Sequence, residues 1–234
     1  MRTLRTALAV PTLLLSLSAF AEGASREETR QVDDFNGVEI SHGLKAEVTV
    51  GPKSVRLSGD EKKLSQVRTE VVNGTLMVRM EKESWHGSAH GIRVIISTPK
   101  LTHVDASGGS QVEAQATAAD SFSAEASGGG SISVKNLDSH KLSVEVSGGS
   151  EVTLQGRADE LKLEASGGAQ VHGKELTLKS LDVDASGGTQ IEANPSERIE
   201  AELSGGSSVD VESNPAQREV SSSGGAQVHF RNKK

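Results

Sequence analysis

The sequence predicts an all-β protein built as a parallel β-solenoid, in which each coil of the chain stacks on the previous one. Ser-Gly-Gly occurs seven times, in steps of 20, 20, 19, 20, 18 and 19 residues. The copies begin at Ser107, Ser127, Ser147, Ser166, Ser186, Ser204 and Ser223. Apolar and polar residues alternate on both sides of each copy, which is typical of strands with one buried face. A fixed turn in a repeat of this length predicts one coil per repeat.

The unit around Ser147 illustrates the alternation. Leu142, Val144 and Val146 precede the turn, and Val152 and Leu154 follow it, with polar residues between them. Each unit is therefore expected to contain a strand, a Ser-Gly-Gly corner, a second strand and a variable return loop. Asn-Pro pairs in two of the return loops are turn formers.

The same repeat could also form a meander of antiparallel hairpins, with Ser-Gly-Gly as the hairpin turn. A solenoid accounts better for the reuse of one sequence, because equivalent residues of successive coils lie above one another. Paired glycines allow a sharp bend without Cβ crowding in such a column. One unit buries about five aliphatic side chains, worth roughly 7–15 kcal/mol. Ordering its ~20 residues costs on the order of 20–40 kcal/mol, so a unit needs neighbours on both sides.

The chain divides into four predicted parts. Residues 1–21 are expected to be a signal peptide, 22–31 a polar N-terminal segment, 32–101 an N-terminal β region that caps the solenoid, and 102–234 the repeat solenoid. The N-terminal β region lacks Ser-Gly-Gly but keeps the alternation. Within it, Asn73-Gly74 between two apolar segments predicts a hairpin with a type I′ turn.

The first 21 residues have the pattern of a secretory signal. Arg2 and Arg5 precede a short apolar run, and small residues allow cleavage after Ala21. The chain has no cysteine, which excludes a disulfide and a lipid anchor on an N-terminal cysteine. No later segment approaches the length of a membrane span, so we expect no membrane insertion. The predicted location is the periplasm or the outside of the cell.

Charge and aromatic content exclude several classes of partner. The formal charge is −7, and cleavage after Ala21 removes two arginines and no acid, which gives −9. Such a charge disfavours nucleic acid and anionic lipid as partners. Aromatic residues make up 2% of the chain, which argues against a deep cleft that stacks on sugar rings.

One acidic position recurs two residues before the corner serine. It is occupied by Asp105, Glu125, Glu145, Glu164, Asp184 and Glu202. If the coils stack in register, these six carboxylates form a line on the outer surface. The line could bind cations such as Ca²⁺, which prefers oxygen ligands. It could equally be a solvated acidic face that discourages lateral aggregation, and the nine-residue calcium-binding repeat of other β-helices is absent.

No residue pattern predicts catalysis, a bound cofactor or a zinc site. His86 and His90 share one loop without an evident third ligand, and His172 and His229 lie three units apart, roughly 14 Å in a stack. The repeated serines occupy equivalent corners, whereas a nucleophile needs one special copy beside a base. No G-x-S-x-G elbow and no phosphate-binding G-x-x-x-x-G-K-[ST] loop occurs.

The sequence resembles a known bacterial family, the head GIN domain, which is described as an auto-transporter adhesin head of unknown function. The resemblance rests on Asp34-Phe35-Asn36-Gly37-Val38, on Val71-Val72-Asn73-Gly74-Thr75-Leu76 and on the recurring Ala-Ser-Gly-Gly units. It covers about residues 32–230. It implies a single-stranded right-handed β-helical fold on an exported protein, and no catalytic residues.

We therefore expect an exported, non-enzymatic structural or interaction module of the cell envelope, adhesin-like in character. Its partner would be a protein or polysaccharide surface. The alternative is a carbohydrate-active enzyme, because polysaccharide-cleaving enzymes also use β-helices.

Overall fold

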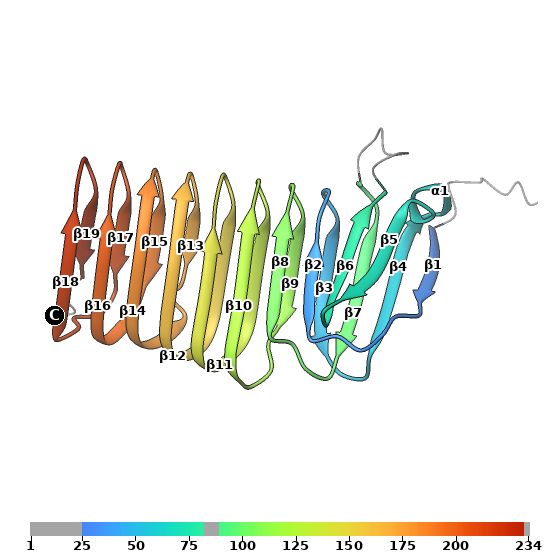
Figure 1. The fold of residues 1–234 in the computed structure, drawn as a ribbon, viewed down its shortest axis with the longest axis horizontal. Coiled ribbons are helices and arrows are strands. Elements are labelled where there is room, and N and C mark those ends of the chain that lie inside the picture. Colours follow the sequence, from blue (N-terminus) through green and yellow to red (C-terminus); the bar gives the residue numbers. More distant parts are fainter. Residues whose placement is uncertain (1–24, 82–88, 232–234) are drawn as a thin grey trace, which may run out of the picture.

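The computed structural model describes residues 25–81 and 89–231 as a parallel β-solenoid, as predicted (Figure 1). The predicted signal peptide and His86 lie outside the described residues. In each coil the chain ascends one sheet, turns through the corner, and descends a second sheet that faces the first. Among the described residues no helix is long and apolar enough to cross a membrane.

The strands that precede the corners form what we term the leading sheet. In spatial order it contains β6 (Thr75–Met80), β2 (Gly37–Ile40), β8 (His103–Ser107), β10 (Ala119–Ser127), the later parts of β11 (Ser131–Val146) and β12 (Glu151–Gly167), β14 (Leu176–Gly187), β16 (Pro195–Leu203) and β18 (Gln217–Ser222).

The strands that follow the corners form the trailing sheet. It contains β7 (Arg93–Thr98), β3 (Lys45–Val50), β9 (Gln111–Gln115), the early parts of β11 and β12, β13 (Gln170–His172), β15 (Gln190–Ala193), β17 (Ser208–Val211) and β19 (Gln227–Phe230). Because β11 and β12 contribute to both sheets, the chain passes from one coil to the next there without a break in strand structure.

The corners stack glycine on glycine, which explains the constancy of the repeat. Gly187 has a φ of 86°, a backbone conformation that side chains rarely adopt. A Cβ on Gly187 would also lie 2.8 Å from the carbonyl oxygen of Gly167 in the preceding coil. The corner therefore requires glycine both for its own conformation and for the approach of its neighbour.

The core lies between the two sheets and runs the length of the stack. The inward positions of the alternating pattern are buried, for instance Val104, Ala124, Val144 and Leu163 in successive coils. Close to the corners the inward residues are small and in several coils polar, such as Ser110, whose hydroxyl donates to the carbonyl of Ile40 at 2.7 Å. The hydrogen bond gives this buried hydroxyl a partner inside the solenoid.

The N-terminal β region contains a further corner that the tripeptide does not reveal. Ser41-His42-Gly43 joins β2 to β3, and His42 and Gly43 have φ values of 64° and 74°. The Cβ position of Gly108 lies 3.5 Å from the nitrogen of His42, so this corner stacks with the Ser-Gly-Gly corners. Residues 32–101 lack the tripeptide Ser-Gly-Gly itself, and histidine occupies the place of the first glycine in this corner.

Coils do not follow sequence order at this end. β2 pairs with both β6 and β8, and β3 pairs with both β7 and β9. The chain thus leaves the β2–β3 coil, forms the β6–β7 coil on its outer side, and then crosses back to start β8. The nitrogen of Thr102 donates to the carbonyl of Asn36 at 2.8 Å where the chain crosses.

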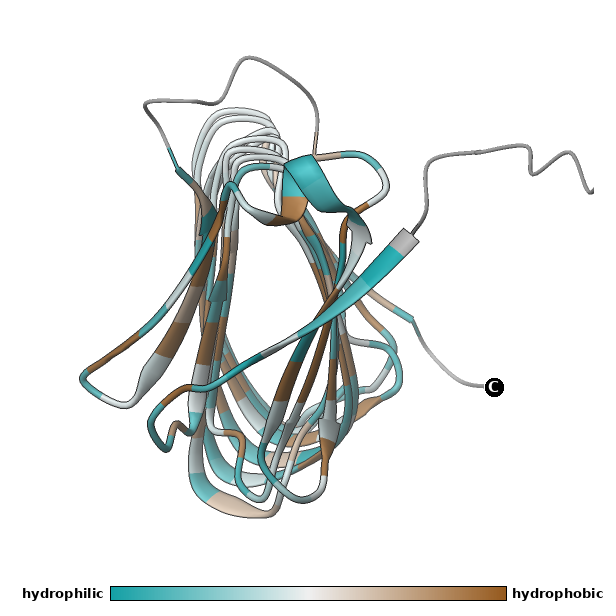
Figure 2. Ribbon diagram, turned by 90° about the vertical axis from the view of Figure 1, so that its right-hand side faces the viewer, coloured by the Kyte–Doolittle hydropathy of each residue, from teal (hydrophilic) through white to brown (hydrophobic). Residues whose placement is uncertain are grey.

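The N-terminal end of the stack carries antiparallel elements (Figure 2). β4 (Ser54–Asp60) pairs with β7, and β1 (Ser25–Arg30) pairs with β4. β5 (Val67–Val72) forms with β6 the predicted hairpin, and Asn73 and Gly74 have the positive φ values of a type I′ turn. Both sheets are thus continued by strands that run against the direction of the coils.

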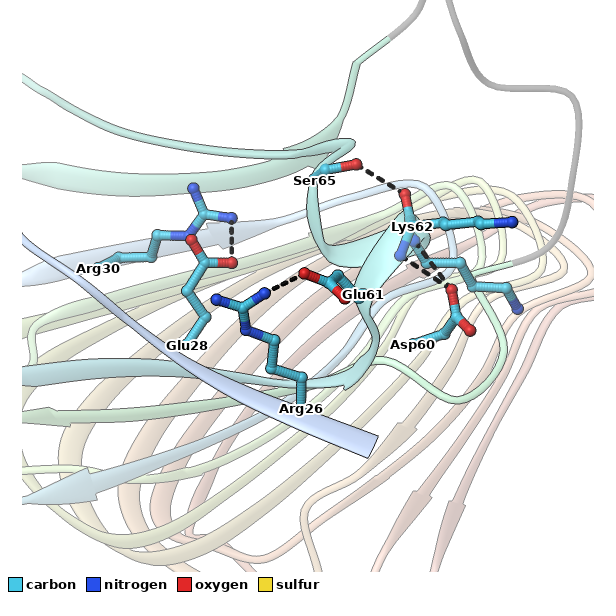
Figure 3. Close-up of polar contacts among 8 residues, drawn as sticks. Arg26, Glu28, Arg30, Asp60, Glu61, Lys62 and Ser65 are labelled. Atoms are coloured by element: carbon cyan, nitrogen blue, oxygen red, sulfur yellow. Dashed lines mark hydrogen bonds and ion pairs between the residues drawn. The ribbon is translucent and has the colours of Figure 1, made fainter. Parts of the chain in front are cut away.

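A short helix, α1 (Glu61–Leu64), lies above this end (Figure 3). The side chain of Asp60 caps it by accepting hydrogen bonds from the nitrogens of Lys62 and Lys63, and Arg26 of β1 pairs with Glu61. Leu64 is buried, so the helix turns an apolar side chain into the end of the core.

Candidate functional site

The six predicted acidic residues form one continuous row on the outer surface of the leading sheet. In the pairing register Asp105 faces Glu125, Glu125 faces Glu145, and the alignment continues through Glu164, Asp184 and Glu202. Adjacent parallel strands lie about 4.8 Å apart, so the row advances by about that distance per coil. The in-register stacking on which the prediction of this row depended is confirmed.

The row is longer than the sequence pattern indicated. Glu39 of β2 aligns with Asp105 and adds a seventh carboxylate, and the row ends at Met77 on one side and at Ser221 on the other. Glu39 stands two residues before Ser41, as each predicted acid stands before its corner serine. His42 hid this relation, since it removes the Ser-Gly-Gly signature. We call these seven residues the acid row.

The corner serines form a second row beside the first. Two residues after each acid, they point to the same side of the sheet as the acids do. A groove of about 690 Å³ runs along both rows, and the acids that line it are Asp105, Glu125, Glu145, Glu164, Asp184 and Glu202. The serines that line it are Ser127, Ser147, Ser166, Ser186, Ser204 and Ser223. The groove therefore presents carboxylates and hydroxyls at regular intervals along the molecule.

A second groove of about 770 Å³ lies on the same sheet, nearer the start of each strand. Its lining includes the cationic side chains of Lys141, Lys162 and Arg198. The amino group of Lys162 lies 2.7 Å from the carboxylate of Glu164, so one ion pair joins the two grooves. The outer surface of the leading sheet thus has a uniformly acidic strip beside a strip of mixed charge.

Asp105 is the acid whose protonation the surroundings change most clearly. Partial burial raises the pKa of its carboxyl to about 6, and the neighbouring charges of Glu39 and Glu125 act in the same direction. The causes are desolvation and like charge, both of which disfavour the carboxylate. The Asp105 carboxyl therefore accepts a proton at a higher pH than an ordinary aspartate does.

The described residues contain no preformed metal cage. In residues 25–81 and 89–231 no three His, Asp or Glu side chains are grouped as a metal site requires. Each coil supplies one carboxylate, whereas calcium takes six to eight oxygen ligands. Cation binding by the acid row thus stays a prediction, beside the alternative of a solvated acidic face.

Of the predicted histidines that the structure describes, His90 lies beside Lys63 of α1, and His172 and His229 lie on the trailing sheet. His172 and His229 occupy one column, separated by Glu192 and Asp210. A hydrogen bond from Lys174, together with the contact of the His172 Nδ1 at 3.0 Å, lowers the pKa of the Glu192 carboxyl. Two acidic side chains thus lie between the two histidines, and the column does not bring the histidines together.

Sequence reasoning missed a histidine–carboxylate pair at the return edge. The Nδ1 of His140 lies 2.6 Å from Asp159, which raises the pKa of the imidazole. Ser139 precedes His140, but its side chain is buried inside the solenoid while His140 is exposed. Since adjacent strand residues point to opposite faces, these residues do not form a nucleophile–base–acid triad.

The fold and its outer surface define a repeat protein that presents a long, regular face. The chain belongs to the family described as "Putative auto-transporter adhesin, head GIN domain", whose model matches residues 34–215. The resemblance seen in the sequence is thereby confirmed.

Solved structures share the fold at low sequence identity. A putative adhesin from Bacteroides fragilis is 20% identical, with a TM-score of 0.84, over 89% of this chain and 97% of its own. A putative lipid binding protein from Parabacteroides distasonis is 12% identical, with a TM-score of 0.72, over 90% and 98%. A putative adhesin from Parabacteroides merdae is 15% identical, with a TM-score of 0.68, over the same shares. No curated protein matches the chain.

Proposed function

We propose that the protein is an exported, non-enzymatic, adhesin-like module of the cell envelope that binds an extended partner along the leading sheet. The observation that carries the proposal is the groove in which acid and serine side chains repeat in register. Five steps from Asp105 to Glu202 give it a length of about 24 Å. A partner that lies along it would meet the same chemistry at every coil.

The composition of the groove suggests how the partner is recognised. Its polar lining consists of hydroxyls and carboxylates, and the described residues that line it include no aromatic side chain. Recognition would therefore depend on hydrogen bonds and charge rather than on stacking against sugar rings. A protein or polysaccharide surface with amino groups fits this chemistry, as does a polymer joined to the carboxylates through cations.

The relatives support the general class. The family and several solved structures are described as putative adhesins. Many weak, equivalent contacts suit adhesion, because a repeated face adds binding energy with each coil that engages the partner.

The second candidate is a carbohydrate-active enzyme, and Asp105 is the residue that favours it. A carboxyl with a raised pKa beside another carboxyl about 5 Å away is the arrangement of retaining glycosidases. The same acidic position recurs in every coil from Glu39 to Glu202, however, which suits a repeated surface better than one catalytic centre. Release of new reducing ends from a panel of glycans, abolished by Asp105→Asn, would establish the enzyme instead.

Binding is tested with two triple variants that remove the same charge from opposite faces. The first carries Glu125→Gln, Glu145→Gln and Glu164→Gln in the acid row. The control carries Glu47→Gln, Glu113→Gln and Glu151→Gln on the trailing sheet. Cosedimentation with purified cell walls and retention on immobilised acidic, neutral and aminated polysaccharides are measured for both and for the unaltered protein.

We expect the acid-row variant to lose retention by at least about tenfold at low salt, because three charge contacts are lost together. The trailing-sheet variant should bind like the unaltered protein. Equal retention of the two variants would contradict the proposal. Export is tested separately by N-terminal sequencing of the protein from native cells, where cleavage after Ala21 is expected.

A further inference from the structure

The two ends of the solenoid are built differently. At the N-terminal end, β1, β4, β5 and α1 extend beyond the last parallel coil. At the other end, β18 and β19 form the last coil of the described residues and pair only with β16 and β17. All six residues of β18 are exposed, and Val220, in an inward position, is 42% exposed. Among residues 25–81 and 89–231, no strand therefore covers the backbone edge or the end of the core there.

Arg218 occupies a core position in this last coil. It aligns with Ile199 of β16, which is fully buried. The same column holds an aliphatic or aromatic residue in each of the five preceding coils, namely Phe122, Leu142, Leu161, Leu181 and Ile199. A charged side chain therefore stands where the repeat otherwise places an apolar one.

The contacts of Arg218 explain how a charge is held there. Its guanidinium carbon lies 4.2 Å from the centre of the Phe230 ring, and its Nε donates to the carbonyl of Pro215 at 2.9 Å. Phe230 belongs to β19 on the trailing sheet, so the arginine side chain spans the end of the core from one sheet to the other. Stacking on the ring lets the cation cover apolar surface while it stays in contact with water.

An open sheet edge is a template for pairing with another chain, and an inward-pointing charge is one device that blocks such pairing. We propose that Arg218 closes the C-terminal end of the solenoid, and that the surface it covers docks a second copy of this chain when the arginine is removed. The inference is independent of the groove and of its partner.

A second copy is the occupant that fits this end. An antiparallel two-fold contact between two β18 strands can place Val220 opposite Val220 of the second copy. In that register Arg218 faces Ser222 and Glu219 faces Ser221, so no like charges are directly opposed. Two last coils also have the same outline, which continues both sheets. With Arg218 present, however, each copy would bury an unpaired guanidinium in the joint core, which is strongly unfavourable.

The test is the mass of the purified protein by sedimentation velocity over a range of concentrations. We expect the unaltered protein to remain a monomer and Arg218→Leu to form a dimer of twice the mass. Arg198→Leu, one coil earlier and pointing outward, is the matched control and should remain a monomer. A monomeric Arg218→Leu protein, or an unaltered protein that already dimerises through this end, would overturn the proposal.

A second substitution locates the contact. Adding Val220→Lys to Arg218→Leu puts a charge back into the joint surface and should restore the monomer. A dimer that survives this change would show that the contact lies elsewhere and would overturn the proposal. If the circular dichroism spectrum shows that Arg218→Leu does not fold as a β protein, Arg218→Gln removes the charge with a smaller change. The mass of that variant by sedimentation velocity, monomer or dimer, then tests the proposal in the same way.

Discussion

At the scale of single residues, backbone space rather than side-chain chemistry limits what the repeat can contain. Gly156 in β12 has a φ of 132°, and a Cβ there would lie 2.3 Å from the carbonyl oxygen of Leu137. The neighbouring coil has a register shift between Val134 and Leu137, which brings the two backbones together. Nothing in the alternation or in the Ser-Gly-Gly spacing marks this position.

Gly156→Ala is expected to lower the free energy of unfolding by at least about 3 kcal/mol, because it adds overpacking to an unfavourable backbone conformation. Urea denaturation followed by circular dichroism measures it. Gly149→Ala is the control, since its Cβ would meet nothing within 4 Å and its φ is not positive. Equal stability of the two variants would contradict the steric explanation.

The acid row shows which part of the candidate site can be predicted from the sequence at the level of single residues. The six predicted acids were visible because each stands at a fixed distance from a glycine pair. Glu39 could not be recognised in the sequence, because His42 replaces the first glycine of its corner. The His140–Asp159 pair could not be recognised either, because its partners lie 19 residues apart on adjacent coils. The raised pKa of Asp105 depends on burial, which spacing alone does not give.

Asp105 should make the protein less stable as the pH rises. Its folded pKa of about 6 lies above the ordinary value of 3.8, so the folded protein holds this proton more tightly than the unfolded chain does. Stability from this group is therefore complete below about pH 4 and is lost as the pH rises through about 6. Asp105→Asn removes the penalty and should raise Tm at about pH 8 while changing little at about pH 3.5.

Asp159 provides the comparison of opposite sign. Hydrogen bonds from Lys179 and His140 lower the pKa of its carboxyl, so its contribution is present at neutral pH and is lost in acid. Asp159→Asn should therefore lower Tm near neutral pH, where Asp105→Asn raises it. Thermal melts across the pH range measure both variants, and shifts of the same sign would refute the argument.

At the scale of elements, the coil is the unit that the sequence encodes. Local signals were sufficient for the Ser-Gly-Gly coils and for the β5–β6 hairpin, since glycine pairs and Asn-Gly each prescribe one turn. They were insufficient for the position of the β2–β3 coil between the β6–β7 and β8–β9 coils. Alternation tells which face of a strand is buried, but it does not tell which strand lies beside it.

If the coil is the structural unit, one complete coil can be removed without loss of the fold. Deletion of residues 148–166 joins Ser147 to Gly167, and the flanking coils then meet in their existing register. We expect a cooperative unfolding transition at a lower Tm, because one coil and one interface are lost. Deletion of residues 148–157 joins a corner to a return edge and should abolish the transition. A folded second variant would show that register between coils is unimportant.

At the scale of the whole molecule, stacking converts a weak motif into a long surface. The acid row needs seven strands from different parts of the chain, and each strand supplies one carboxylate. The two ends of the stack are treated separately, with antiparallel strands and a helix at one and Arg218 at the other. The acid row, the antiparallel cap and the closure by Arg218 are thus properties of the whole stack and not of any single repeat.

The backward crossing of the chain near Thr102 also sets an order of assembly. Both neighbours of the β2–β3 coil, β6–β7 and β8–β9, come later in the sequence. The earliest coil therefore has both of its neighbours only once residues up to about 115 are present, and we expect residues 37–115 to associate first, as one cooperative unit. Every later coil can then add singly to a finished edge. New coils would then add at the C-terminal side during folding, and coils would also unfold first from that side. The solenoid would therefore fold in one direction along its sequence.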